Sequence, residues 1–266
     1  MEDEVITSPA NKDVKLLRSL QMSKYRKQTG WFLAEGMRIC KEAISLGHAP
    51  MRLVYAAGRG DDAMIAELIA ACRDSGGRAM AVDPDLLGRI SRKDNPQMVI
   101  GAFAQKWQKP DVIQPVKDDL WIALDRVRDP GNLGTIMRTS DAVGAKGLIL
   151  IDDCTDPYSL EGVRASMGAV FNVALVRMSE SEFVQFANGW PGAIIGTALQ
   201  ASVDYRAADY SGATIMLMGN EQAGLTERLR ACTTQLIRMP MQGRSDSLNL
   251  AVATGVSLYE WLRGRV

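Results

Sequence analysis

The sequence is poor in the side chains that most often hold metal ions or act as general bases. It has one histidine and four cysteines in 266 residues. A Ser-His-Asp triad would need His48 as its base, and His48 follows a predicted helix in an expected surface loop. The four cysteines, Cys40, Cys72, Cys154 and Cys232, are scattered and form no C-x-x-C pair, so we expect no metal site. Cys40 and Cys72 lie on predicted helices, where we expect buried thiols.

Long apolar runs are also absent, which argues against a membrane-spanning segment. The first residues, MEDEVITSPANKD, are acidic and polar, unlike a secretory signal or a transit peptide, so we expect a cytoplasmic protein without a membrane partner. The net charge is zero, which argues against binding of nucleic acid by bulk charge. A basic stretch from Lys12 to Lys27 is the exception, and on its own a solvated helix face would explain it.

Strand and helix patterns alternate through the N-terminal part, which predicts a small α/β/α domain. The predicted helices are Asn11–Ser23, Met37–Leu46, Ala63–Arg73 and Asp83–Ile90, and the predicted strands are Trp31–Leu33, Met51–Ala57, Ala79–Val82 and Met98–Ala104. The stretch Gln105–Asp119 has two prolines and little periodicity, as linkers do. We therefore predict a domain at residues 1–105, a linker at 106–118 and a second domain at 119–266.

The second domain repeats strand–helix units, which predicts a mainly parallel sheet with helices on both faces. Asn132 is the predicted N-cap of the first helix, and Ser179 with Glu182 forms a predicted capping box. The predicted strands are Leu120–Val127, Gly147–Ile151, Asn172–Val176, Ala193–Thr197, Ile215–Met218 and Leu236–Met239; the predicted helices are Leu133–Val143, Tyr158–Ser166, Ser179–Ala187, Thr226–Ala231 and Ser247–Trp261.

The strands Ile215–Met218 and Leu236–Met239 each run into a loop rich in glycine and polar residues. Open α/β sheets bind ligands at such strand ends. The second loop leads to Ser247, Leu248 and Asn249, at a predicted helix start with free backbone N–H groups. No G-x-G-x-x-G follows a predicted strand, which argues against a dinucleotide-dependent dehydrogenase.

Three blocks in this half resemble the SpoU (TrmH-type) branch of the SPOUT methyltransferases. They are DPGNLGTIMRTSDAVGAKGLIL from Asp129, IMLMGNEQAGL from Ile215, and IRMPMQGRSDSLNLAVATGVSLYEW from Ile237. The resemblance implies transfer of a methyl group from S-adenosylmethionine to a ribose 2′-hydroxyl of RNA. It also implies a deep trefoil knot in the α/β domain, which composition would never suggest because knots are rare in protein folds.

Two N-terminal blocks, GWFLAEGMRICKEAISLG (Gly30–Gly47) and SRKDNPQMVIGAF (Ser91–Phe103), resemble the L30e-like substrate-binding domain of the same family. The resemblance makes the basic stretch a source of RNA phosphate contacts, with Arg26 and Lys27 as candidates. An ordinary surface charge is the alternative at each position.

The resemblance also implies where the cofactor binds. S-adenosylmethionine carries no phosphate, so backbone groups at several strand ends suffice to hold it. Core packing is a compatible interpretation of Ile237 and Met239, and tight turns would explain Gly219 and Gly224. The candidate cofactor contacts are Thr197, Ala198, Leu199, Gly219, Asn220, Glu221, Ile237, Met239, Ser247, Leu248 and Asn249.

The catalytic candidates implied by the resemblance are Arg138, Asn132, Glu221, Ser247 and Asn249. A hydroxyl nucleophile must lose its proton, and the family's proposed acceptor corresponds to Arg138. Because a guanidinium stays charged in proteins, we expect Arg138 to position the hydroxyl and stabilise developing negative charge.

The sequence thus predicts a 2′-O-ribose RNA methyltransferase acting on ribosomal RNA. A transfer-RNA methyltransferase and an RNA-binding module without catalysis are the alternatives. A homodimer is expected through the final helix, whose predicted apolar face includes Leu250, Ala251, Ala253, Val256 and Tyr259.

Overall fold

A mixed four-stranded sheet forms the centre of the N-terminal unit, in the order β1-β4-β2-β3. Strands β2 and β3 are parallel, and β4 pairs antiparallel with β1 and β2. The elements are α1 (Lys12–Ser19), α2 (Ser23–Thr29), β1 (Trp31–Glu35), α3 (Met37–Ser45), β2 (Arg52–Ala56), α4 (Ala63–Asp74), β3 (Arg78–Val82), α5 (Pro84–Ser91) and β4 (Val99–Ala104).

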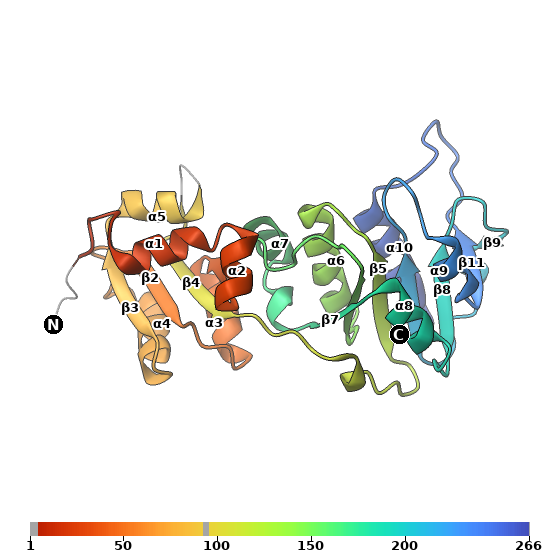
Figure 1. Ribbon diagram of the computed structural model, residues 1–266, viewed down its shortest axis with the longest axis horizontal. Coiled ribbons are helices and arrows are strands. Elements are labelled where there is room, and N and C mark those ends of the chain that lie inside the picture. The colour runs from red at the N-terminus through yellow and green to blue at the C-terminus, as the bar shows by residue number, and fades with distance from the viewer. Residues whose placement is uncertain (1–4, 93–95, 266) are drawn as a thin grey trace. The chain divides into compact units, whose positions relative to one another are not determined.

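Helices α1 and α5 pack on one face of this sheet, where Leu17 and Leu87 join Val54 and Ile100 in one core, and α3 and α4 pack on the other (Figure 1). The predicted α/β/α arrangement is therefore confirmed. Helix α2 was not predicted as a separate helix, because no side chain caps its start at Met22. The structure describes residues 5–92 and 96–265, so part of the predicted block Ser91–Phe103 lies outside the described residues.

The segment Asp156–Phe171 belongs to this N-terminal unit, although it lies within the sequence range predicted for the second domain. It contains α7 (Leu160–Ser166) and the short 3-10 helix Ala169–Phe171. The rings of Tyr158 and Phe171 lie 4.7 and 5.4 Å from Phe32. The edge of His48 packs against Phe171, so this histidine is half-buried and has a structural environment.

Two ion pairs hold the same segment within the unit. Arg164 forks onto Glu35 with distances of 2.7 to 3.0 Å and also donates to the carbonyl oxygen of Ser91. Arg26 donates two hydrogen bonds to one oxygen of Asp156 and others to the carbonyl oxygens of Leu20 and Gln21. These contacts make the segment an integral part of the N-terminal unit.

The second unit comprises Lys106–Thr155 and Asn172–Val266 and is built on a seven-stranded parallel sheet. Strands β5, β6 and β10 are buried at every residue, as expected for strands covered on both faces. The strands are β5 (Leu120–Asp125), β6 (Gly147–Ile151), β7 (Ala174–Met178), β8 (Ala193–Thr197), β9 (Val203–Asp204), β10 (Thr214–Met218) and β11 (Gln235–Arg238), in the order β7-β6-β5-β10-β8-β11-β9.

Helices cover both faces of this sheet, which confirms the prediction (Figure 1). Helices α6 (Pro130–Ala142) and α10 (Leu250–Arg263) pack together on one face, and α8 (Glu180–Ala187) and α9 (Glu227–Ala231) pack together on the other. The order places β10 between β5 and β8, although β10 follows β8 in the chain. The carboxyl ends of these strands therefore form a topological switch point. The trefoil knot remains a prediction.

Two helices that border the site start at other residues than predicted: α6 was expected to have Asn132 as its N-cap, and α10 was expected to begin at Ser247. Helix α6 begins at Pro130, and its N-cap is Asp129, whose side chain accepts from the backbone N–H of Asn132 at 2.6 Å. Asn132 therefore lies inside the helix, and the predicted cap was wrong. Helix α10 begins at Leu250 with Asn249 as its N-cap. The predicted capping box of Ser179 and Glu182 is confirmed.

We expect Arg164→Met to lower the free energy of unfolding by about 3–5 kcal/mol, because it removes the forked ion pair that Arg164 makes with the buried carboxylate of Glu35. The Glu35 side chain is only 2% exposed. Urea denaturation of the full chain measures the change. Lys41→Met is the control, since Lys41 and Glu67 form a largely exposed pair worth less than about 1 kcal/mol. Equal losses for the two variants would contradict the prediction.

Candidate active site

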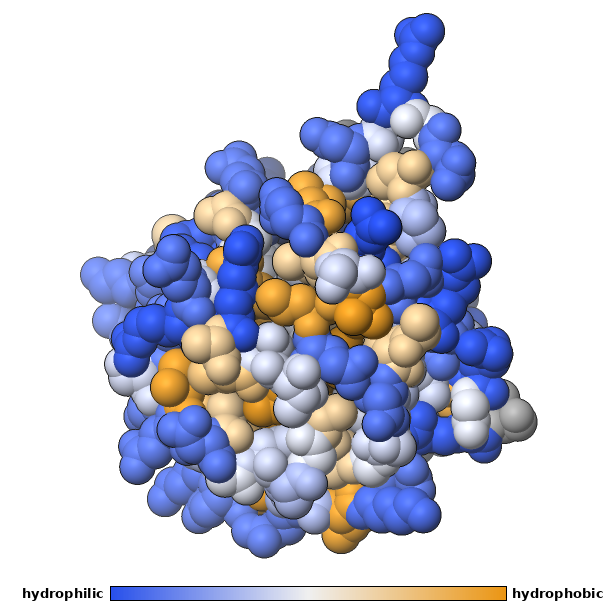
Figure 2. Space-filling view, turned by 90° about the vertical axis from the view of Figure 1, so that its right-hand side faces the viewer, coloured by the Kyte–Doolittle hydropathy of each residue, from blue (hydrophilic) through white to orange (hydrophobic). Residues whose placement is uncertain are grey.

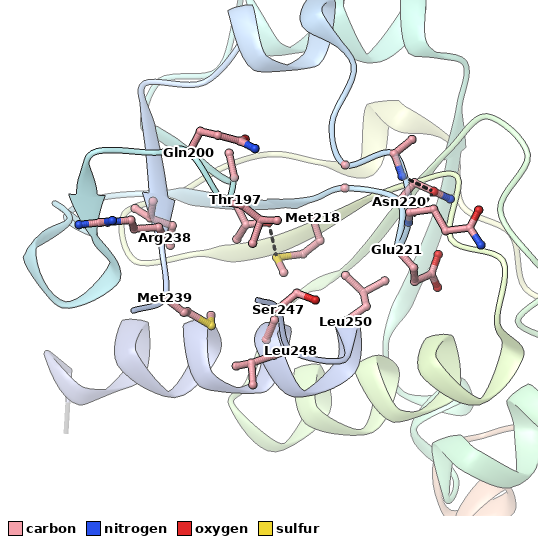
Figure 3. Close-up of a pocket in the computed structure, with 18 of the residues that line it drawn as sticks. Thr197, Gln200, Met218, Asn220, Glu221, Arg238, Met239, Ser247, Leu248 and Leu250 are labelled. Atoms are coloured by element: carbon pink, nitrogen blue, oxygen red, sulfur yellow. Dashed lines mark hydrogen bonds between the residues drawn. The ribbon is translucent and has the colours of Figure 1, made fainter. Parts of the chain in front are cut away.

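A cavity of about 500 Å³ opens at the carboxyl ends of β8, β10 and β11 and is bordered by the start of α10 (Figure 3). Every residue that the sequence analysis assigns to cofactor contact lines it. Further residues that line the cavity were not predicted. They reach it because the strands they follow, or the helices they lie on, have an end at the same edge of the sheet. These are Gln200, Met218, Gln222, Ala223, Gly224, Arg230, Arg238, Met241, Leu250 and Ala253.

Strand pairing forms one wall of the cavity. Strands β8 and β11 are parallel neighbours, and the backbone N–H of Ala198 donates to the carbonyl oxygen of Ile237 at 3.0 Å. The side chain of Ile237 is fully buried while the residue still lines the cavity. Its two predicted roles, core packing and cavity lining, therefore coexist.

The loop Gly219–Gly224 forms a second wall. The side-chain oxygen of Asn220 accepts from the backbone N–H groups of Gln222 and Ala223 at 3.0 Å, which tightens the loop. Gly224 has φ +66°, and a Cβ on Gly219 would lie 2.5 Å from the backbone of Gly224. Both glycines are thus required by the turn itself, and the same turn places Glu221 beside the cavity.

Three polar side chains connect the segments around the cavity. The amide nitrogen of Asn132 donates to Glu221 at 3.3 Å, and its oxygen accepts from the side chain of Asn249 at 2.9 Å. The oxygen of Asn249 accepts from the backbone N–H groups of Ala251 and Val252 at the start of α10. Asn132 can make these contacts because Asp129 caps α6 in its place.

Arg138 lies apart from this group. It is exposed on α6, does not line the cavity, and forms no hydrogen bond or ion pair with any residue in 5–92 or 96–265. The structure therefore brings together Asn132, Glu221 and Asn249, with exposed Ser247 on the cavity wall, but it leaves Arg138 outside the cavity of its own chain.

A second cleft of about 450 Å³ shares the loop Gly219–Gly224 with the first and adds Arg126, Arg128 and Asp129. Arg126 forks onto the fully buried Asp125 at 2.7 and 2.9 Å, and this hydrogen bonding raises the pKa of its guanidinium. Arg126 has φ +50°, a strained value for a non-glycine residue. Asn220 helps to hold it, donating to its carbonyl oxygen at 2.8 Å.

The predicted RNA contacts differ in their environments. The side chain of Arg26 is 5% exposed and engaged with Asp156. This burial argues against the predicted contact of Arg26 with RNA phosphates. Lys27 is exposed and remains a candidate.

Cys40 and Cys72 are buried thiols, as predicted, whereas Cys154 and Cys232 are half-buried. Burial raises the pKa of Cys40 to about 12 and the pKa of Cys72 and Cys154 to about 11, so all three stay protonated near neutral pH.

Among residues 5–92 and 96–265, no group of three or more histidine, cysteine or acidic side chains could hold a metal ion. Within those ranges, no helix combines the length and apolar content needed to cross a membrane.

Two family models match the chain. Residues 119–259 match the SpoU rRNA Methylase family, and residues 11–101 match the MRM3-like substrate binding domain. The first match covers more than half of the chain. The chain therefore belongs to the SpoU rRNA methylase family, as its sequence blocks predicted.

Two relatives named as 23S rRNA methyltransferases are similar to this chain along most of its length. The chain is 33% identical over 248 residues to a 23S rRNA (uridine(2479)-2′-O)-methyltransferase of Streptomyces viridochromogenes, which covers 91% of this chain and 85% of that protein. It is 29% identical over 260 residues to the 23S rRNA (guanosine(2553)-2′-O)-methyltransferase RlmP of Bacillus subtilis (strain 168), with 97% and 99% covered.

Solved structures of two relatives carry the same fold. The AdoMet-bound rRNA methyltransferase from Sinorhizobium meliloti superposes with a TM-score of 0.93 at 42% identity, covering 99% of this chain and 98% of that one. The SpoU methyltransferase AviRb from Streptomyces viridochromogenes, in complex with AdoMet, gives a TM-score of 0.86 at 31% identity, with 96% and 98% covered.

We expect Gly219→Ala to lower the free energy of unfolding by about 1–3 kcal/mol, because the added Cβ would meet the backbone of Gly224 and Leu225 at 2.5 Å. Thermal and urea unfolding measure this change. Gly243→Ala is the matched control in a nearby loop, since nothing lies within 4 Å of its Cβ position. A variant at Gly219 as stable as the wild type would show that the loop can move aside.

Proposed function

We propose that the chain is an S-adenosylmethionine-dependent methyltransferase that methylates a ribose 2′-hydroxyl of ribosomal RNA in the cytoplasm. The observation that carries this proposal is the cavity at the topological switch point, lined by every residue expected to contact the cofactor. Its volume of about 500 Å³ is typical of sites for small molecules. Ribosomal RNA is favoured over transfer RNA by the relatives that act on 23S rRNA.

The residues present fit the proposed cofactor. Backbone groups at the ends of β8 and β11 and the loop Gly219–Gly224 surround a space that mixes apolar and polar side chains. Glu221 supplies negative charge beside a ligand that carries positive sulfonium and ammonium groups. When bound there, S-adenosylmethionine supplies an electrophilic methyl group for an oxygen nucleophile.

The residues of the chain then have distinct roles. Asn132 holds Glu221 and Asn249 in fixed positions, so the loop Gly219–Gly224 and the start of α10 keep their spacing. For the RNA, we propose that residues 1–105 bind the substrate, with Lys27 as one contact, and that residues 106–118 link this domain to the catalytic residues 119–266.

We also propose a homodimer through α10. Of the residues expected on its partner face, Leu250 and Ala251 are buried within the chain, Ala253 and Val256 are half-buried, and Tyr259 is 55% exposed. Val252, which was not among the expected residues, is 52% exposed on the same helix. Figure 2 shows hydrophobic side chains gathered on the face of the second unit where β9 and β11 lie, surrounded by hydrophilic ones. Because α6 packs on α10, Arg138 would act at the seam of such a dimer and not in the cavity of its own chain.

Incubation with labelled S-adenosylmethionine and ribosomal RNA tests the proposed reaction. We expect label in the RNA, in nucleosides that mass spectrometry of a nuclease digest identifies as 2′-O-methylated. Label on a base would overturn the proposed acceptor. Transfer RNA, supplied in parallel, tests the alternative substrate, and its preferential labelling would replace ribosomal RNA in the proposal.

Arg138→Ala is expected to reduce the single-turnover rate with saturating RNA by about 10²–10³-fold, because it removes a group that stabilises negative charge on oxygen. Cofactor affinity should stay near the wild-type value, since Arg138 does not line the cavity. Arg138→Lys should restore little activity, because an ammonium lacks the planar fork. Normal turnover by Arg138→Ala would remove this residue from the mechanism.

Val252→Lys is expected to convert the proposed dimer into the 29.0 kDa monomer, because it places a charge on an exposed apolar helix face. Sedimentation at micromolar concentration measures the change. Met64→Lys is the matched control, since Met64 is an exposed apolar residue of α4 in the other unit. A wild-type chain that sediments only as the monomer would contradict the dimer.

A further inference from the structure

Arg230 lies on α9, the short helix that follows the loop Gly219–Gly224, and it lines the cavity. Its neighbour Arg228 does not line the cavity and pairs with Glu180 at 2.9 Å. Two arginines of one helix thus have different environments, and one of them borders the proposed cofactor site.

The guanidinium of Arg230 has no partner within residues 5–92 and 96–265. Its Nε is buried and makes no hydrogen bond, and no carboxylate forms an ion pair with it. Its Nη2 lies 3.8 Å from the Cβ position of Gly224, against the cavity loop. A partly buried charge without a counter-ion is unfavourable, so an anionic ligand group would stabilise it.

The other charged residues that line the cavity have different environments. Glu221 accepts a hydrogen bond from Asn132. Arg238 is exposed, and its charge helps to lower the pKa of Asp204, after the larger contribution of Arg206. Figure 3 shows Glu221 and Arg238 on opposite sides of the cavity.

We propose that Arg230 binds the carboxylate of the methionine moiety of S-adenosylmethionine. This assignment rests on the proposed function, which supplies a ligand with one carboxylate. The planar fork of arginine matches a carboxylate with two parallel hydrogen bonds, and such charge-assisted bonds are stronger than neutral ones. Arg230 is then the residue that makes the cavity prefer a nucleoside carrying the complete amino-acid tail.

Calorimetry of the full chain with two ligands tests the proposal. S-adenosylmethionine carries the carboxylate, whereas 5′-methylthioadenosine shares its adenosine and sulfur but lacks the amino-acid tail. We expect Arg230→Gln to weaken S-adenosylmethionine binding about tenfold or more, and to leave 5′-methylthioadenosine binding unchanged. Arg228→Gln is the matched control, with the same change of charge on the same helix, and should alter neither affinity.

Each outcome decides the assignment. Equal weakening of both ligands would show that Arg230 only shapes the cavity, and would overturn it. Unchanged binding of both ligands with weaker binding of RNA would assign Arg230 to an RNA phosphate instead. If Arg230→Gln does not fold, Arg230→Lys keeps the charge without the fork, and a selective loss of a few fold for S-adenosylmethionine is expected. A wild-type chain that binds neither ligand would overturn the proposed cofactor itself.

Discussion

The hydrogen bonds of Asn132 are the interaction on which the cavity depends. They join the start of α6 to the loop after β10, 89 residues later in the sequence, and to the start of α10, 117 residues later. Asp129 makes this possible by capping α6, because a capping residue would have its side-chain oxygen occupied by its own helix. The position of one cap therefore determines whether the walls of the cavity are connected.

The sheet order provides the second constraint. Because β10 lies between β5 and β8, the loop Gly219–Gly224 adjoins the residue after β5, where Asn220 holds the strained Arg126. Strain of this kind persists only where surrounding contacts fix it, and it is common near functional sites. The fully buried Asp125 adds a further restraint by fixing the guanidinium of the same residue.

Much of this architecture could be predicted from local patterns. Buried parallel strands such as β5 and β10 are short apolar runs, and their carboxyl ends locate the cavity residues. The cap of α6 could not be settled this way, since aspartate and asparagine cap equally well, although Pro130 at the first helical position favours Asp129. The association of Asp156–Phe171 with the N-terminal unit depends on packing against Phe32, which is distant in sequence.

Arginine residues show most clearly where local reasoning ends. Arg26 lies in a basic stretch that suggests contact with RNA, yet its partner is Asp156, 130 residues away. Charge and helix position are visible in the sequence, but the carboxylate that neutralises the charge is fixed only by the tertiary fold. Arg26 forms an ion pair with a carboxylate of its own chain, whereas Arg230 forms no ion pair with any described residue. The physical distinction between a structural arginine and a ligand-binding one is therefore which molecule supplies the anion.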